Sequence, residues 1–310
     1  MGSQQSVIEE KKKDNTILNI LNVFPDIPDY RDYKYTLSEL EEKNQVKKDL
    51  HLQINNVDNF NITDGYSIAF CISIIIFNEL KIKGEETFLP SINYIFYNSL
   101  LVEYNTNNID NLSLIRLSLR NTLKSLNVYG ICPEVKCPFS DVFYYKPNEE
   151  CYQQGKYYHF KYSRVENDNN IIKKLLNNNK LILINLTIYT SFLKNKLNKE
   201  GILDYPDEYD SILGMICCII VGYTETKIIL RTCFNEEWGN KGCFYIDYNY
   251  LSNMCNDLWL INVFIDKKKK FGLQLETLEN NNSQKNNKKM EKNIDNNQEQ
   301  INSMLRGSVF

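Results

Sequence analysis

The apolar residues follow different patterns in the two halves of the chain. Residues 67–80 are apolar on every side of a helix, which predicts a buried helix, and Asp64 and Gly65 before them suit its first turn. Residues 112–126 predict a second helix. Short apolar or alternating runs, broken by Gly, Asn and Asp, predict strands at 181–189, 216–223, 227–233 and 243–247. A helical half followed by a β half predicts an α+β fold.

The two ends of the chain are poor in residues that could pack into a core. Residues 266–310 hold nine Lys or Arg against six Asp or Glu and contain repeated Asn, and residues 3–16 are also polar. Such segments cannot bury enough apolar surface to offset the entropy cost of ordering them. We therefore expect a flexible arm at 1–22, a folded body at 23–265 and a disordered tail at 266–310.

Composition and charge narrow the classes of function. The 310 residues have a formal net charge of −3, which argues against a nucleic-acid binder. The longest nearly unbroken apolar run, 213–223, is far shorter than the roughly 20 residues of a membrane-spanning helix. No signal peptide is visible, so we expect the nine cysteines to be reduced thiols. The 42 Asn, and 30 Lys against 6 Arg, indicate an AT-rich genome such as that of a large DNA virus or a protist.

Five segments together resemble the papain-like cysteine peptidases, including the compact cathepsin-like members of bacteria and large viruses. They are FPDIPDYRDY (24–33), LPSINYIFYN (89–98), YGICPE (129–134), LGMICCIIVGY (213–223) and WGNKGCFYI (238–246). The resemblance spans about 23–265 and implies a papain-like two-domain fold. We expect a helical domain at 23–150, a β domain at 151–265 and a cleft between them.

The resemblance also implies where catalytic residues belong. The family places a thiolate at the N-terminus of the central helix, a His as acid and base, an Asn that orients the His, and a Gln that donates to the oxyanion. The matching positions hold Ser67, Ile216, Thr232 and Asn61. Ile216 follows Ser67 by 149 residues, the expected separation, but isoleucine cannot accept a proton. We therefore expect no retained catalytic residue and no peptidase activity.

Other side chains leave two alternatives open. The chain has two histidines, His51 and His159, and we interpret both as ordinary surface or packing residues. The cysteines at 71, 217 and 218 are predicted core residues. Cys233 adjoins the Asn position, so one alternative is a hydrolase that uses Ser67 or Cys233 with an unidentified base. The other is a structural protein whose cleft is filled by Tyr66 and Ile216.

We expect neither a metal nor a cofactor. Cys132, Cys137 and Cys151 could pair or bind zinc, but they have no His beside them and lack a fourth Cys.

The N-terminal residues predict a lipid anchor. Met1-Gly2-Ser3-Gln4-Gln5-Ser6 fits the pattern for myristoylation of Gly2. One myristoyl chain binds membranes weakly, and the cations that would supply a second contact are Lys267, Lys268, Lys269 and Lys270. The sequence thus predicts a non-catalytic papain-fold protein in the cytoplasm, on the cytosolic face of a membrane or in a virion. Its cleft would bind an extended peptide or protein.

Overall fold

The computed structural model describes residues 21, 23–36, 46–54, 66–107, 109, 115–140, 145–194, 200–236 and 238–266. The chain divides into two compact units, Met1–Phe264 and Ile265–Phe310. Nearly all described residues belong to the first unit. Gly2, Asn61 and Lys267–Lys270 lie outside the described residues, as does almost all of the predicted arm and tail. The division of the body near residue 150 stays a prediction.

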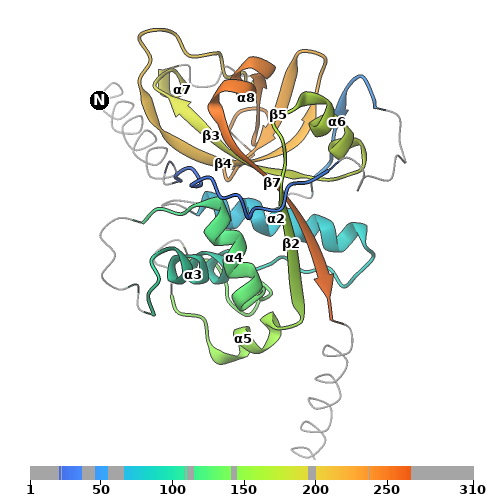
Figure 1. Ribbon diagram of the computed structural model, residues 1–310, viewed down its shortest axis with the longest axis vertical. Coiled ribbons are helices and arrows are strands. Elements are labelled where there is room, and N and C mark those ends of the chain that lie inside the picture. The colour runs from blue at the N-terminus through green and yellow to red at the C-terminus, as the bar shows by residue number, and fades with distance from the viewer. Residues whose placement is uncertain are drawn as a thin grey trace, which may run out of the picture. The chain divides into compact units, whose positions relative to one another are not determined.

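Helices and strands follow one another in an α+β arrangement (Figure 1). The helices are α2 (Ser67–Ile82), α3 (Ile92–Glu103), α4 (Leu119–Tyr129), α5 (Glu149–Gly155), α6 (Asn169–Asn177), α7 (Ser191–Lys194) and α8 (Tyr248–Met254). The strands are β1 (Leu50–His51), β2 (Tyr158–Arg164), β3 (Ile182–Tyr189), β4 (Ile212–Tyr223), β5 (Lys227–Arg231), β6 (Cys243–Asp247) and β7 (Cys255–Ile265).

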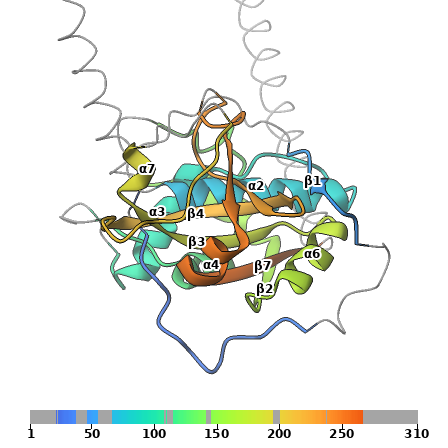
Figure 2. The ribbon, with the colours of Figure 1, turned by 90° about the horizontal axis from the view of Figure 1, so that it is seen from above.

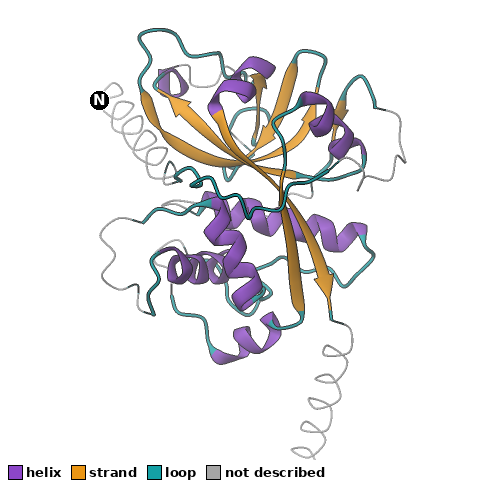
Figure 3. Cartoon of the chain, in the orientation of Figure 1, coloured by secondary structure: helices purple, strands orange, loops and turns teal. Residues whose placement is uncertain are grey.

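The described strands form one sheet in the order β2-β7-β3-β4-β5-β6, with β1 added to the end of β4. Strand β3 pairs antiparallel with both β4 and β7, and β5 pairs antiparallel with both β4 and β6. Every residue of β3 except the last is buried, so this strand lies at the centre of the core. Figure 3 shows that β2 and the second half of β7 extend past the other strands and run beside the helices.

The central helix α2 packs between the sheet and the other helices (Figure 2). Twelve of its sixteen residues are buried, including every residue from Ser67 to Ile76. This confirms the predicted buried helix, because only a helix enclosed on all sides can be apolar on all faces. The helix has no side-chain cap at Tyr66, and a single cation, Lys81, occupies its last turn.

The second predicted helix is displaced along the chain. Helix α4 begins at Leu119, not at residue 112, because the Ser118 side chain caps it by accepting from the Asn121 amide at 3.4 Å. It ends at Gly130, whose φ of 74° favours glycine. A Cβ at Gly130 would lie 1.8 Å from the carbonyl oxygen of Gly155. The ends of α4 and α5 can therefore approach this closely only because residue 130 is a glycine.

The four predicted strands are present with small shifts of their ends. Strand β4 begins at Ile212, four residues early, and β5 ends at Arg231, two residues early. Strands β2 and β7 were not predicted from the apolar pattern.

Residues 23–36, which we call the entry segment, connect the helices to the sheet. The amide of Phe24 donates to the Leu117 carbonyl at 3.2 Å, just before α4. The amide of Tyr35 donates to the Arg164 carbonyl at 2.8 Å, at the end of β2. Between these points the amide of Asp26 donates to the Asp257 carboxylate of β7 at 3.0 Å. The entry segment thereby fixes α4 against the β2–β7 pair, as Figure 1 shows in dark blue.

Candidate functional site

Ser67, which the resemblance predicts at the nucleophile position, is the first residue of α2. Its side chain is fully buried, and its Oγ has no hydrogen-bond partner in the part of the chain that the structure describes. A serine hydroxyl attacks a carbonyl only when a base accepts its proton. Within the described residues, no such base faces Ser67. The predicted oxyanion position, Asn61, lies outside those residues.

Ile216, which the resemblance predicts at the histidine position, lies within β4 opposite Leu186 of β3 and is 1% exposed. Thr232, which the resemblance predicts at the asparagine position, directly follows β5 and is fully buried. Its Oγ1 donates to the carbonyl oxygen of Cys217 at 2.8 Å. The Cys71 thiol, one turn after Ser67 in α2, donates to the same carbonyl at 3.4 Å. The structure thus brings α2, the middle of β4 and the end of β5 together around one main-chain carbonyl.

This shared acceptor was not predicted from the sequence. A main-chain carbonyl has no residue type to mark it, so only the fold could reveal its role. The threonine hydroxyl turns to the backbone of β4 and makes no contact with an imidazole, since Ile216 supplies none. Thr232 and Cys71 therefore make their hydrogen bonds to the backbone of β4 and not to a catalytic side chain.

The two histidines lie at other points of the sheet. His51 of β1 pairs with Gly222, six residues beyond Ile216, which places it about 20 Å along the strand. Burial lowers the pKa of His51. His159 lies on β2, and the strand order puts β7 and β3 between β2 and β4. Neither imidazole occupies the position of a base for Ser67.

Cys233, the second alternative nucleophile, is 3% exposed. Burial raises its pKa to about 12, and burial also raises the pKa of Cys71 well above the ordinary value. The thiolate is the reactive form of cysteine, so neither thiol is activated. All nine cysteines of the chain are buried and free.

Cys132, Cys137 and Cys151 lie together in a hydrophobic cluster with Tyr94. The Asn93 amide donates to the Cys137 sulfur at 3.2 Å, and burial raises the pKa of Cys132 and Cys151. The described residues hold no group of three or more His, Cys, Asp or Glu arranged to bind a metal ion. The cluster therefore fills space between α3 and α5.

The aromatic residues of the site pack in two separate groups. Tyr66 is 5% exposed, and its ring centroid lies 4.0 Å from that of Phe96 on α3 and 5.0 Å from that of Phe139. Phe234 packs against Trp238 at 4.1 Å, and both lie near Phe192 after β3. Tyr66 thus belongs to the helical side, whereas Phe234 and Trp238 belong to the sheet side.

The fold is the papain-like fold, an α+β fold. The structure is similar to xylellain, a cysteine protease from Xylella fastidiosa, with a TM-score of 0.68 and 23% identity over 79% of this chain and 96% of that one. It is also similar to procathepsin B from Trypanosoma congolense, with a TM-score of 0.60 and 12% identity over 79% and 86% of the two chains. At these identities the likeness defines the fold and not the activity.

A protein of similar sequence also carries a papain-type (C1-like) description. The chain is 29% identical over 204 residues to "Uncharacterized peptidase C1-like protein L477" of Acanthamoeba polyphaga mimivirus. That match covers 61% of this chain and 64% of the viral protein, so the chain spans less than two thirds of its relative. No protein-family model matches the chain. The fold and the relative together support the resemblance to papain-like peptidases.

Proposed function

We propose that this protein is a papain-like peptidase homologue that has lost catalysis, a pseudopeptidase that acts by binding. The observation that supports this most is the pair Ser67 and Ile216. The hydroxyl at the predicted nucleophile position is buried with no hydrogen-bond partner in the described part of the chain, and the predicted position of the base holds a buried isoleucine. Removal of both nucleophile and base abolishes nearly all of the chemical advantage of a catalytic triad.

The proposed ligand is an extended segment of a peptide or protein, held without cleavage. Papain-like peptidases bind their substrates between the helical and β domains, and the resemblance includes both domains of this chain. An isoleucine in place of histidine makes that region more apolar. We propose no metal, cofactor or nucleic acid.

A covalent probe tests the absence of catalysis at Ser67. A fluorophosphonate reacts with a serine hydroxyl only when a base activates it. We expect no labelling of the folded protein by intact mass spectrometry, with a serine hydrolase as positive control. Labelling at Ser67 that is absent in Ser67→Ala would support the hydrolase alternative.

We further propose that myristoylation of Gly2 brings the protein to the cytosolic face of a membrane or into a virion. Lys267–Lys270 would add electrostatic attraction to anionic lipid, at about 1 kcal/mol for each lysine near the surface. No helix within the described residues is long and apolar enough to span a bilayer. These proposals rest on the sequence pattern alone.

Co-expression with an N-myristoyltransferase followed by vesicle sedimentation tests this anchor. We expect the acylated protein to sediment with vesicles that contain phosphatidylserine and Gly2→Ala to stay in the supernatant. Replacement of the four lysines by Gln should weaken sedimentation while acylation, read by mass spectrometry, is unchanged. Equal sedimentation of Gly2→Ala would exclude the anchor.

A further inference from the structure

A cavity of about 420 Å³ lies between the entry segment, α4 and β2. Ser67, Ile216 and Thr232 are not among the residues that line it. Its size falls in the range of small-molecule sites, roughly 300–1,000 Å³. It is therefore a candidate second site, independent of the proposed function.

The cavity has an excess of positive charge. Its lining includes four cationic side chains, Arg31, Arg120, Lys124 and Lys161, but only two carboxylates, Asp29 and Asp32. The net charge of +2 contrasts with the formal charge of −3 for the whole chain. An excess of this kind favours an anionic ligand.

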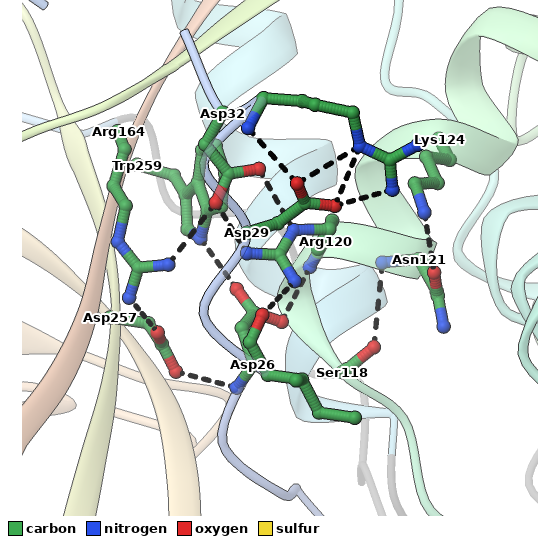
Figure 4. Close-up of polar contacts among 12 residues, drawn as sticks. Asp26, Asp29, Asp32, Ser118, Arg120, Asn121, Lys124, Arg164, Asp257 and Trp259 are labelled. Atoms are coloured by element: carbon green, nitrogen blue, oxygen red, sulfur yellow. Dashed lines mark hydrogen bonds and ion pairs between the residues drawn. The ribbon is translucent and has the colours of Figure 1, made fainter. Parts of the chain in front are cut away.

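Both carboxylates are already bound by arginines (Figure 4). Asp29 accepts from Arg31 Nε at 3.0 Å and from Arg31 Nη2 at 2.7 Å, and this arginine holds the pKa of Asp29 well below its usual range. Asp32 accepts from Arg120 Nε at 2.9 Å and from Arg164 Nη1 at 3.3 Å. These arginine contacts occupy both carboxylates and leave them unavailable as cation ligands.

Two side chains, one in the entry segment and one on α4, still have N–H groups that could donate to a ligand. Arg31 uses Nε and Nη2 for Asp29, while its Nη1 makes no hydrogen bond to any described residue. The Lys124 ammonium, on α4, donates to the Asn121 side-chain oxygen at 3.3 Å, and no carboxylate of the described chain lies within ion-pair distance of it. Figure 4 shows Lys124 directed to Asn121 and away from the two aspartates. Both side chains are exposed and can reach a ligand.

Aromatic rings complete the lining. Tyr33 comes from the entry segment, and Phe160 and Tyr162 come from β2. The Lys161 ammonium lies 4.1 Å from the centre of the Tyr33 ring. The Phe160 amide donates to the Asn127 side-chain oxygen of α4 at 2.9 Å, which fixes β2 against the helix. The cavity thus offers flat apolar surfaces beside its cations.

We propose that this cavity binds an aryl phosphate, a phosphomonoester attached to an aromatic group. Such a phosphate carries −1.5 to −2 charges near pH 7, which matches the excess of about two positive charges. Arg31 Nη1 and Lys124 Nζ would contact the phosphate oxygens, and the Tyr33 and Tyr162 rings would contact the aromatic group.

Isothermal titration of the full-length protein with phenyl phosphate tests this site. We expect phenyl phosphate to bind more tightly than inorganic phosphate, which lacks the ring, and than phenyl sulfate, which carries one charge. Arg31→Gln and Lys124→Gln should each weaken phenyl phosphate binding about tenfold, the effect of one lost charge-assisted hydrogen bond. Lys48→Gln, an equal change of charge at an exposed lysine outside the cavity, should leave it unchanged.

Three outcomes would overturn the proposal. They are the absence of phenyl phosphate binding, an equal affinity for phenyl sulfate, and equal weakening by Lys48→Gln and Lys124→Gln. Thermal melting of each variant separates loss of binding from loss of folding, and a second replacement, Lys124→Arg, should retain binding because it keeps the charge.

A further titration tests whether the aryl phosphate belongs to a protein or to a free small molecule. Tyr30 lies in sequence between the lining residues Asp29 and Arg31 and is 96% exposed, and Ile27 of the same segment is 81% exposed. A phosphotyrosine peptide that binds more tightly than free phosphotyrosine, and loses that gain in Tyr30→Ser, indicates a protein-borne ligand. Equal affinities of the two indicate a free small molecule, and binding of neither contradicts the proposal.

Discussion

At the scale of single residues, the site is defined by two hydroxyls with opposite surroundings. Thr232 donates to the Cys217 carbonyl at 2.8 Å, whereas the Ser67 hydroxyl is buried without a partner among the residues that the structure describes. An unsatisfied buried polar group costs about 1–3 kcal/mol, and a satisfied one contributes about 1 kcal/mol. The two residues therefore act on stability in opposite directions.

Ser67→Ala should leave the free energy of unfolding unchanged or raise it by about 1 kcal/mol, because it removes the unpaired hydroxyl. Thr232→Val, which keeps the shape and removes the donor, should lower it by about 1 kcal/mol. Urea unfolding at one pH gives both values. A clear loss of stability in Ser67→Ala would mean that the Ser67 hydroxyl has a partner after all.

We expect Asp26 to make a pH-dependent contribution to the free energy of unfolding. It accepts from Trp259 Nε1 at 2.8 Å and from the Arg120 amide at 2.9 Å. Burial, followed by repulsion from Asp257, raises its pKa to about 6. The folded state thus binds the proton more tightly than the unfolded state does. The associated stability is present below about pH 4 and is lost as the pH rises through 6.

The difference between the unmodified protein and Asp26→Asn isolates this effect. The stability advantage of the aspartate should fall by about 2 kcal/mol between pH 4 and pH 7, since one pKa unit corresponds to about 1.4 kcal/mol and part of the change lies below pH 4. Chemical unfolding of both proteins over this range measures it. A difference independent of pH would show that the pKa of Asp26 is not raised.

At the scale of elements, a buried ion pair fixes the end of α2. Glu79 accepts from the Lys180 ammonium at 2.8 and 3.0 Å, and the same ammonium donates to the Asn262 side chain of β7 at 3.3 Å. The Glu79 side chain is 3% exposed, so its carboxylate depends on Lys180 for compensation. The pair joins the central helix to the start of β3 and to β7.

Lys180→Met should lower the free energy of unfolding by about 3 kcal/mol, because it leaves a buried carboxylate unpaired. The double variant Glu79→Leu with Lys180→Met should recover most of that loss. A double-mutant cycle by urea unfolding gives the coupling energy. Additive effects of the two replacements would show that the ion pair between Glu79 and Lys180 does not contribute to the free energy of unfolding.

Much of this arrangement followed from the sequence where apolar residues dominate. The buried helix at 67–80 and the strands around 216–223 and 243–247 were predicted because burial on all sides leaves a continuous apolar run. Helix α4 was misplaced because the cap at Ser118, and not the apolar pattern, sets its start. Strand β2 was missed because its exposed residues, such as His159 and Lys161, interrupt the pattern.

The site was predictable only in part. Ser67, Ile216 and Thr232 were located by resemblance, and the fold places them on α2, β4 and the end of β5. The Cys217 carbonyl and the Arg120–Asp32 contact join residues far apart in sequence. Their partners depend on how the elements pack, which no local pattern specifies.

At the scale of the whole molecule, the nine cysteines form part of a reduced core. All are buried, and burial raises the pKa of seven of them besides Cys233, namely Cys71, Cys132, Cys151, Cys217, Cys218, Cys243 and Cys255. We expect iodoacetamide to modify none of them in the folded protein and all nine after unfolding in urea, as read by mass spectrometry. Selective modification of Cys233 in the folded state would support the alternative in which Cys233 is a nucleophile.

The loss of peptidase activity is the central claim, and one measurement tests it directly. The purified protein and Ser67→Ala are incubated with a diverse peptide mixture, and cleavage is read by mass spectrometry. We predict no cleavage by the protein above that of the variant, because no base faces Ser67 among the described residues and the resemblance predicts Ile216 at the histidine position. Cleavage that Ser67→Ala abolishes would contradict the account and show that another residue acts as the base.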